Sequence, residues 1–324
     1  MPNPPLLEVR DLTLSYGSGS KKLTALDRVS FTIKQAGEAL AVVGESGSGK
    51  SSLASAIMKI LPNNVSEFSG SVRLNGEDIK EMPESQLSRS IRWKRVSWVP
   101  QEASAVFNPI YQIGRQLEET LGVHGVRDSQ VRRAEAIRLF QLVGLNSESD
   151  LAKYPSELSG GMRQRAAIAM ALALKPSLVI LDEPTSALDV SLQGGIISLL
   201  QDLRDQFDLS YIFITHDVVL ATKLCNSFVV LYGGRIAEYG SREAVIDRAS
   251  HKYTRALLNC VPTFEPGQKM LSIPGEPPDL RKVAGRCPFY PRPAIRCDGC
   301  RENEPPVLVE VEEGHWVAQH ILSS

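Results

Sequence analysis

The stretch that decides the fold occupies residues 39–52 and reads Ala39-Leu40-Ala41-Val42-Val43-Gly44-Glu45-Ser46-Gly47-Ser48-Gly49-Lys50-Ser51-Ser52. An apolar run of strand length breaks into glycine and serine, and apolar residues at helical spacing follow. The interval from Gly44 to Gly49-Lys50-Ser51 matches the phosphate-binding loop, in which backbone N–H groups and a helix N-terminus surround an anion. A flexible glycine-serine connection is the alternative. We predict a nucleotide site in which Lys50 neutralises the β- and γ-phosphates and Ser51 ligates Mg²⁺.

Length and charge bound the class of protein. At 324 residues the chain exceeds one ordinary hydrophobic core, so we expect more than one structural unit. The formal net charge of −1 gives no overall basic field, which argues against nucleic acid as a partner. The first residues lack a secretory signal, and the longest apolar run, Ala166 to Leu174, is too short to span a bilayer. We therefore expect a soluble cytosolic chain.

The region before the loop has the pattern of antiparallel strands. Apolar and polar residues alternate over Leu7 to Tyr16, and the period of two returns at Val29, Phe31 and Ile33. Tyr16 ends the first of these strands. We interpret its ring as a stacking surface for adenine, and an edge tyrosine that only packs is the alternative.

Two later strands end in single polar residues. Gln101 follows the apolar run that starts at Val96, and His216 follows the run that starts at Tyr211. Ligands gather at the carboxyl ends of strands in α/β sheets. We therefore predict that Gln101 reaches Mg²⁺ and the attacking water, and that His216 contacts the γ-phosphate. A surface amide and a structural histidine are the alternatives.

Paired carboxylates follow another buried strand. Asp182 and Glu183 come directly after the apolar residues 178–181. Adjacent acids at the end of a buried strand concentrate negative charge that a cation must neutralise. We predict that Asp182 holds Mg²⁺ and that Glu183 positions or deprotonates the attacking water.

A helical segment separates these strands. From about residue 102 to residue 165 the apolar spacing becomes helical, as over Val131 to Val143, where Gly144 is the expected residue after the helix end. We interpret it as an inserted helical subdomain. At its end, Ser159-Gly160-Gly161 precedes a long apolar helix and forms a second anion site, with an ordinary serine N-cap as the alternative.

The two anion sites suggest a shared nucleotide. The helical insertion separates Lys50 from Ser159, so we do not expect both to meet the same phosphate within one chain. A head-to-tail pair of subunits sandwiches each ATP between Lys50 of one subunit and Ser159 of the other. Nucleotide binding then closes the pair, and hydrolysis lets it open.

Taken in order, these motifs resemble the nucleotide-binding subunit of an ABC transporter. The resemblance implies a P-loop NTPase (RecA-like) α/β core with an antiparallel β subdomain, an inserted helical subdomain and a small irregular C-terminal extension. It implies a signature sequence at Leu158–Met162 and a D-loop at Ser186–Asp189. The implied ATP-binding residues are Tyr16, Gly44, Glu45, Ser46, Gly47, Ser48, Gly49, Lys50, Ser51 and Ser52, with Ser159, Gly160 and Gly161 contacting ATP in trans. The implied catalytic residues are Lys50, Gln101, Glu183 and His216, and the Mg²⁺ ligands are Ser51, Gln101 and Asp182.

The resemblance extends to the dipeptide, oligopeptide and nickel importer branch through Phe107-Asn108-Pro109, the segment that starts at His251 and the Pro- and Cys-containing tail. It implies an ABC ATP-binding domain at 1–250 and an extension at 251–324. The implied partners are two membrane-spanning permease subunits, a second ATP-binding subunit and, indirectly, an extracytoplasmic solute-binding protein, with the chain peripheral at the cytoplasmic face of the plasma (inner) membrane. Peptide, nickel and oligosaccharide remain open as cargo.

Two other functions compete with transport. A non-transport ABC ATPase of DNA repair or translation is disfavoured by the single cassette, which lacks a coiled-coil arm and a basic patch. A regulatory module with little turnover is disfavoured by the intact Glu183.

The tail departs from the branch that it resembles. The branch commonly carries four cysteines that hold an iron–sulfur cluster, and this chain matches them at Cys287 and Cys300 only. Pro293 and Gln319 occupy the other two places, and Cys297 is additional. Because a cluster normally takes four thiolates, we predict no iron–sulfur cluster and free thiols instead.

Prolines from Pro262 to Pro293 exclude long helices in the tail. We expect turns and short strands, such as Val307 to Val311, that pack on the main domain or on the neighbouring cassette.

Overall fold

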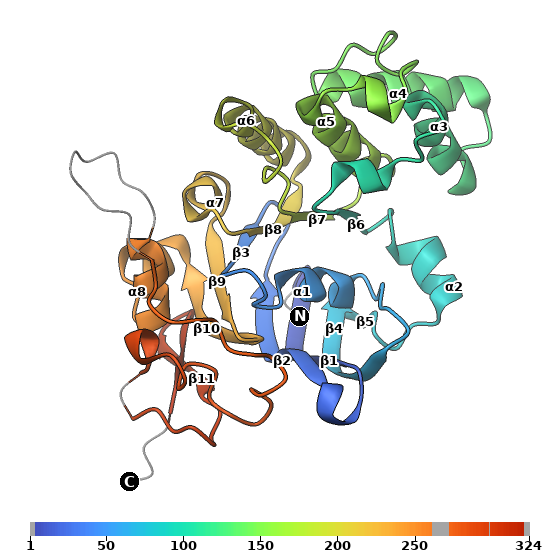
Figure 1. Ribbon diagram of the computed structural model, residues 1–324. Coiled ribbons are helices and arrows are strands. Elements are labelled where there is room, and N and C mark those ends of the chain that lie inside the picture. Colours follow the sequence, from blue (N-terminus) through green and yellow to red (C-terminus); the bar gives the residue numbers. More distant parts are fainter. Residues whose placement is uncertain (1–3, 261–271, 298, 321–324) are drawn as a thin grey trace. The chain divides into compact units, whose positions relative to one another are not determined.

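The computed structural model describes residues 4–260, 272–297 and 299–320 (Figure 1). The chain divides into two compact units, one built from Met1–Glu81 with Phe213–Ser324 and the other from Met82–Ile212. Both units contain helices and strands, as the expected α/β fold class requires. Within the described ranges, no helix is long and apolar enough to cross a membrane.

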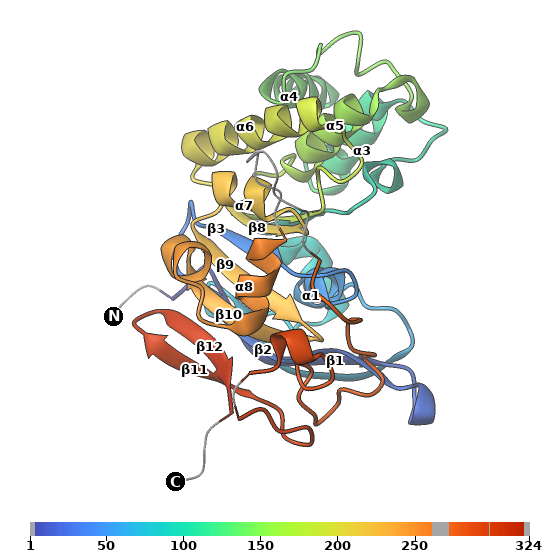
Figure 2. The ribbon, with the colours of Figure 1, turned by 60° about the vertical axis from the view of Figure 1, so that its left-hand side comes forward.

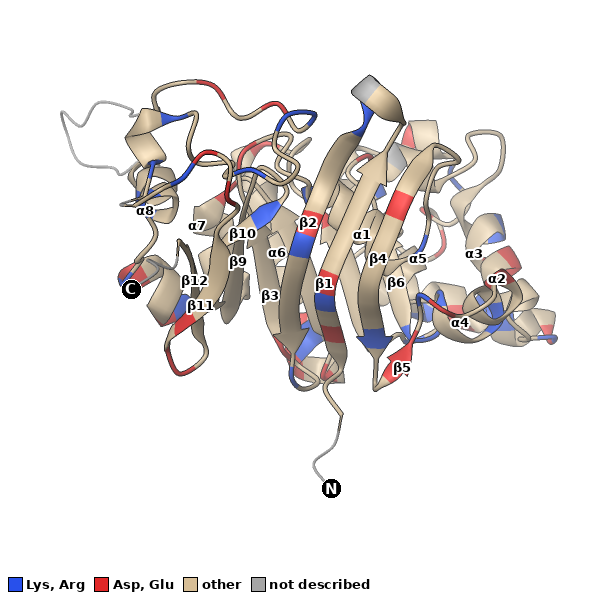
Figure 3. Cartoon of the chain, turned by 90° about the horizontal axis from the view of Figure 1, so that it is seen from below, with Lys and Arg blue, Asp and Glu red and all other residues tan. Residues whose placement is uncertain are grey.

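The first unit contains a four-stranded antiparallel sheet in the order β2-β1-β4-β5. Its strands are β1 (Leu7–Tyr16), β2 (Leu23–Ile33), β4 (Val65–Leu74) and β5 (Glu77–Asp78). The alternation in β1 buries Leu7 and Val9, and after a register shift between Val9 and Leu12 it buries Leu12 and Leu14. Figure 3 shows charges of both signs on these strands, where Arg10 pairs with Glu8. The expected antiparallel sheet is therefore present. Its strands carry both positive and negative side chains, so they do not form a surface of a single charge.

The phosphate loop belongs to a second sheet of the same unit. Strand β3 (Ala39–Val43) lies parallel to β9 (Ser227–Tyr232), and every β3 residue is buried. Strand β10 (Arg235–Ser241) pairs with β9, and the hairpin of β11 (Val307–Glu312) and β12 (His315–Gln319) continues the sheet beyond β10 (Figure 2). The helices of this unit are α1 (Lys50–Ile57), α7 (Val218–Leu224) and α8 (Lys252–Asn259).

The second unit is mainly helical and includes the segment 102–165. Its elements are α2 (Glu84–Gln86), β6 (Val96–Val99), α3 (Ile113–Val123), α4 (Ser129–Leu142), α5 (Gly160–Ala171), β7 (Leu178–Asp182) and α6 (Val190–Phe207). Strands β6 and β7 are parallel, and β8 (Ser210–Thr215) leads the chain back to the first unit. Gly144 follows α4 with φ of 70°, which confirms its predicted place beyond the helix end.

Short helical turns complete the described chain. They are η1 (Gly19–Lys21), η2 (Leu87–Ile91), η3 (Ala103–Val106), η4 (Pro155–Glu157), η5 (Glu243–Asp247) and η6 (Pro293–Ile295).

The C-terminal extension folds as expected for a proline-rich segment. After α8, its described residues form turns and the β11–β12 hairpin, and Pro262 and Pro266 lie outside those residues. The extension packs on the main domain, because Arg235 donates to Pro306 O at 3.1 Å and β10 pairs with β12.

A buried carboxylate ties β10, α8 and β12 together. Glu238 is fully buried and accepts hydrogen bonds from the backbone N–H groups of Ser250 (2.7 Å) and His251 (3.0 Å). Nε2 of His315, on the tail hairpin, lies 2.8 Å from Glu238 Oε1. The carboxylate of β10 therefore satisfies donors from two other segments, the start of α8 and β12, which joins the start of the extension to its end.

His251 caps the N-terminus of α8, where its Nδ1 accepts a hydrogen bond from Tyr253 N at 3.1 Å. Burial lowers the pKa of His251 to about 3, so the ring remains neutral in the folded protein at neutral pH. The unfolded chain takes up this proton near pH 6.5. The contribution to the free energy of unfolding is therefore present above about pH 6.5 and is lost as the pH falls towards 3.

We expect that lowering the pH from 7.5 to 5.5 removes about 1.4 kcal/mol from the free energy of unfolding through His251 alone. Urea denaturation at both pH values measures it. His251→Asn keeps a capping oxygen but does not titrate, so its loss of stability should be smaller by that amount. Equal losses in the wild type and the variant would contradict the prediction.

Candidate nucleotide-binding site

The phosphate loop runs from the end of β3 into α1 and leaves no space for side chains at two of its glycines. A β-carbon added at Gly44 would lie 2.1 Å from Leu231 O, and one at Gly49 would lie 2.4 Å from Ala25 O. The φ angles of these glycines are 156° and 107°, values that residues with a β-carbon rarely adopt. Glycine is required at both places because the backbone of neighbouring strands touches the loop.

Lys50 is the first residue of α1 and is only 6% exposed. Its Nζ donates to Gly44 O at 2.8 Å and to Glu45 O at 2.9 Å, so the ammonium lies over the loop. Gly49, the N-cap of α1, has no side chain with which to cap the first turn. The loop thus presents a positive charge and a helix N-terminus to the same place, the arrangement that an anion requires.

Glu45 is the one acidic residue of this loop, and the C-terminal extension neutralises it. Arg292 Nη1 donates to Glu45 Oε2 at 2.6 Å, and Arg292 Nη2 lies 3.2 Å from Oε1. Although burial opposes the charge on Arg292, its hydrogen bonds to Glu45 leave its pKa above the ordinary value. The Glu45 N–H donates to the hydroxyl of buried Tyr253 at 3.1 Å. Both the side chain and the N–H of Glu45 therefore support the loop.

Sequence reasoning missed Arg292 and Tyr253 as residues that hold the loop. Glu45 itself was the available signal. A carboxylate in a phosphate-binding loop repels the ligand unless it points away from it and pairs with a cation. The sequence contains no indication of which cation it finds.

The first unit also carries two single site residues. Tyr16 ends β1 half-buried and pairs across the sheet with Leu23 and Val65, so its ring stands at a strand end as expected. His216 is exposed after β8, between Thr215 and Asp217. The Asp217 side chain caps α7, which fixes the turn that carries His216.

The second unit brings together the predicted water-activating residues. Gln101 Nε2 donates to Glu183 Oε2 at 3.1 Å, which joins two residues that are far apart in the sequence. Asp182 ends β7 and is 2% exposed. Glu183 adopts a left-handed backbone conformation with φ of 47°, which is uncommon for a residue with a β-carbon and aims its side chain differently from a continuing strand.

A hydrogen-bonded turn holds the segment after Glu183. Ser186 donates through its N–H (3.2 Å) and its hydroxyl (3.0 Å) to Glu183 O. Gln193 of α6 donates to Thr185 O and Leu188 O, both at 3.2 Å. These bonds fix the backbone of the expected D-loop at Ser186–Asp189.

Ser159 is the N-cap of α5, because its hydroxyl accepts a hydrogen bond from Met162 N at 3.3 Å. Ser159 and Gly160 are exposed, whereas Gly161 is buried. The ordinary capping role is thus present, and it places the exposed residues at a helix N-terminus, where an anion is favoured.

The predicted site residues fall on both units. Tyr16, the loop 44–52 and His216 belong to the first unit, and Gln101, Asp182, Glu183 and 159–161 belong to the second.

Comparison with known proteins supports the expected family. A family model described as ABC transporter matches residues 26–186, and one described as Oligopeptide/dipeptide transporter, C-terminal region, matches residues 237–300. The chain is 40% identical to the oligopeptide transport ATP-binding protein OppD of Salmonella typhimurium, over 93% of this chain and 90% of that protein. It is 39% identical to the dipeptide transport ATP-binding protein DppD of Caldanaerobacter subterraneus subsp. tengcongensis, over 98% and 97%.

A solved structure has a similar fold. The chain superimposes with a TM-score of 0.65 on the dimeric ATP-binding cassette MJ0796 in a post-hydrolysis state bound to ADP and phosphate, at 27% identity. The match covers 72% of this chain and 98% of that cassette.

We expect Arg292→Ala to weaken ATP binding about three- to tenfold, because it leaves the Glu45 carboxylate unpaired beside the phosphate loop. Titration with a fluorescent ATP analogue measures the dissociation constant. Arg292→Lys keeps the positive charge but cannot form the bidentate pair of hydrogen bonds with Glu45, so its effect should be intermediate.

The double variant Glu45→Gln with Arg292→Ala is the matched control, since it removes both charges and should recover most of the affinity. Thermal unfolding verifies that each variant is folded. An unchanged dissociation constant in folded Arg292→Ala would contradict the role assigned to this pair.

Proposed function

This chain belongs to the ABC transporter family, and from that premise we propose that it is the ATP-hydrolysing subunit of an importer that takes up peptides. The observation that carries the proposal is the similarity over nearly the whole chain to proteins named for oligopeptide and dipeptide transport. That similarity includes the C-terminal region at residues 237–300. A non-transport ABC ATPase of DNA repair or translation is not favoured, because the matched C-terminal region is described as that of oligopeptide and dipeptide transporters.

In this proposal Glu183 is the general base of ATP hydrolysis. Its half-buried carboxylate accepts a hydrogen bond from Gln101, so the amide orients the carboxylate towards the attacking water. His216 contacts the γ-phosphate, and Tyr16 stacks on adenine. Lys50 exchanges its contacts with the loop carbonyls for the β- and γ-phosphates.

The donor set suits a magnesium ion. Ser51, Gln101 and Asp182 offer a hydroxyl, an amide and a carboxylate oxygen, and Mg²⁺ prefers oxygen ligands. When bound, the ion supplies neutralisation of phosphate charge. These three residues are the ones that would hold it.

The proposed assembly follows from the family. Ser159, Gly160 and Gly161 contact the ATP of a second ATP-binding subunit, and two permease subunits transmit the closure to a transmembrane path. An extracytoplasmic solute-binding protein delivers the cargo. The chain is peripheral at the cytoplasmic face of the membrane, with its ATP-binding domain at 1–250 and its extension at 251–324.

We expect Glu183→Gln to lower ATP turnover by about 10²–10⁴, the usual contribution of a general base, while ATP binding is retained. In cells that depend on this chain, the same variant should abolish uptake of labelled di- and tripeptides. Phosphate release and peptide accumulation measure the two effects.

Glu148→Gln, an exposed glutamate of the second unit, is the matched control and should leave both rates unchanged. Turnover of Glu183→Gln within threefold of the wild type would contradict the general-base role of Glu183. Normal peptide uptake in cells that lack the chain would contradict the importer assignment.

A second expected outcome concerns the shared site. The Glu183→Gln protein, alone or with its partner cassette, should sediment as a dimer with ATP and as a monomer without it. Adding Ser159→Arg should prevent the association, because a bulky side chain then stands where the partner's phosphates bind. Ser156→Arg, an exposed control three residues earlier, should still associate. Association of the Ser159→Arg protein would argue against the trans contact.

A further inference from the structure

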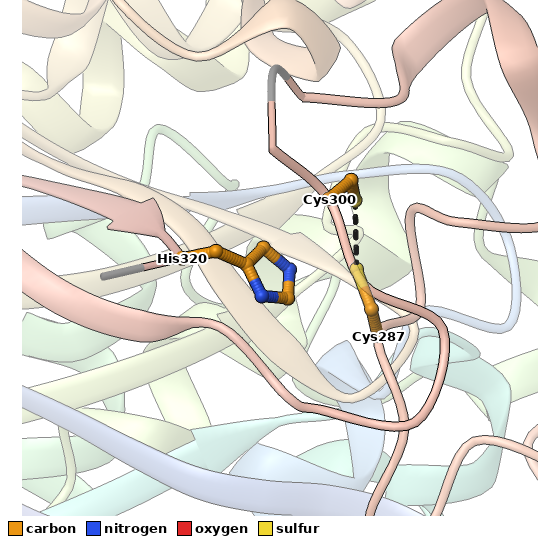
Figure 4. A group of neighbouring side chains, drawn as sticks. All are labelled: Cys287, Cys300 and His320. Carbon is orange, nitrogen blue, oxygen red and sulfur yellow. Dashed lines mark hydrogen bonds between the residues drawn. The ribbon is translucent and has the colours of Figure 1, made fainter. Parts of the chain in front are cut away.

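Three cysteines and a histidine gather in the C-terminal extension, remote in sequence from the nucleotide motifs. The sulfur atoms of Cys287 and Cys300 lie 3.2 Å apart, and ligand atoms of Cys287, Cys300 and His320 all lie within 4.8 Å of one another (Figure 4). In Figure 4 the His320 ring extends from the end of β12 towards the two cysteines.

Cys297 precedes Cys300 in a tight turn. Its carbonyl oxygen accepts a hydrogen bond from Cys300 N at 3.2 Å, which keeps the two residues close together. The spacing Cys297-x-x-Cys300 is common among zinc ligands. Cys297 is half-buried, like Cys300, and is therefore available as the third thiol of the group.

At the end of β12, the side chain that faces the cysteines and can serve as a fourth ligand is His320 and not Gln319. Successive side chains point to opposite sides at the end of a strand, so Gln319, at the end of β12, is exposed and His320 is buried with 9% exposure. Both ring nitrogens of His320 are buried and have no hydrogen-bond partner among the described residues. A buried imidazole with neither nitrogen satisfied is a strong indication of a missing partner.

The group does not fit an iron–sulfur cluster. Such a cluster normally takes four thiolates, and this group offers three, from Cys287, Cys297 and Cys300. In a four-iron cluster each thiolate binds a different iron, so the sulfurs lie farther apart than sulfurs that share one ion. Here they are separated by only 3.2 Å.

The spacing fits one tetrahedral ion. With a metal–sulfur bond of about 2.3 Å, two thiolates of a tetrahedral zinc site lie about 3.8 Å apart. The sulfurs of Cys287 and Cys300, 3.2 Å apart, need only a small shift to reach this separation, and a ring nitrogen of His320 lies within 4.8 Å of both. Three sulfurs and one imidazole nitrogen form a known structural zinc set.

We propose that the C-terminal extension binds one Zn²⁺ through three thiolates and one imidazole, supplied by Cys287, Cys297, Cys300 and His320. On binding, the three thiols release their protons to the solvent and the neutral imidazole donates a ring nitrogen. No oxidant or reductant takes part.

The ion joins two parts of the extension. Cys287 and Cys297 flank the segment that carries Arg292, and His320 follows β12. Zinc therefore fixes the Arg292 segment to the β11–β12 hairpin in a part of the chain that has a small core of its own. Arg292 donates two hydrogen bonds to Glu45 of the phosphate loop. The zinc site therefore also stabilises the contact between the extension and that loop.

The metal content of the purified full-length chain tests the proposal. We expect about one zinc per chain by mass spectrometry of the elements, with no stoichiometric iron or acid-labile sulfide. Cobalt in place of zinc should give the visible bands of a tetrahedral thiolate site. Stoichiometric iron and sulfide would overturn the proposal, as would loss of two titratable thiols to a disulfide in denatured, unreduced protein.

Variants assign the ligands. His320→Gln and Cys297→Ser should each lower the zinc affinity at least tenfold in competition with a chromophoric chelator. His320→Cys should retain zinc and shift the cobalt spectrum, since it restores a fourth ligand. Cys260→Ser, a half-buried cysteine outside the group, should bind zinc like the wild type. Equal zinc affinity in all four variants would refute the ligand assignment.

Chelation of zinc from the wild type needs no substitution and provides an independent measurement. It should lower the melting temperature and raise the dissociation constant for ATP severalfold, and it should have little further effect on affinity in Arg292→Ala. The link to the loop rests on the proposed nucleotide site, whereas the metal content and the melting temperature do not. A melting temperature unchanged by complete removal of zinc would overturn the structural role of the ion.

Discussion

The close approach of neighbouring strands to the phosphate loop is the constraint on which the nucleotide site depends. Leu231 O and Ala25 O lie within 2.4 Å of the positions that β-carbons would take at Gly44 and Gly49, so any side chain would push the loop away from β9 and β2. The N–H of Gly234 adds a 3.0 Å hydrogen bond to Ser48 O. The loop is therefore shaped by its surroundings before any ligand arrives, and its N–H groups need little reorganisation to meet a phosphate.

The extension takes part in this arrangement through charge. A carboxylate in the phosphate loop would repel the ligand, and burying it alone would be costly. Arg292, 3% exposed, removes that problem with two hydrogen bonds to Glu45. Glu238 is likewise a carboxylate whose burial is compensated by hydrogen bonds, here from His315 and from two backbone N–H groups. Two acids of the core domain thus depend on the extension for partners.

Short-range patterns were sufficient for most of the elements. The strand Leu7–Tyr16 and the helix end at Gly144 were predicted correctly, because alternation and capping are decided within a few residues. The same local patterns placed Gln101 and Glu183 each after a strand, but they did not predict the hydrogen bond between the two side chains. Strand ends could be read from the sequence, and the hydrogen bond between them could not.

The sequence by itself determined that this protein has a phosphate loop, a pair of acids after a buried strand and an α/β core, since each of these is encoded by local spacing. Only the tertiary structure decided that Arg292 pairs with Glu45, 247 residues away, because no periodicity connects such distant positions. It also decided that His320 and not Gln319 faces Cys287, since the side of a strand on which a residue lies depends on how that strand is paired. Long-range contacts of single side chains leave no local trace in the sequence, and they are what the folded chain supplies.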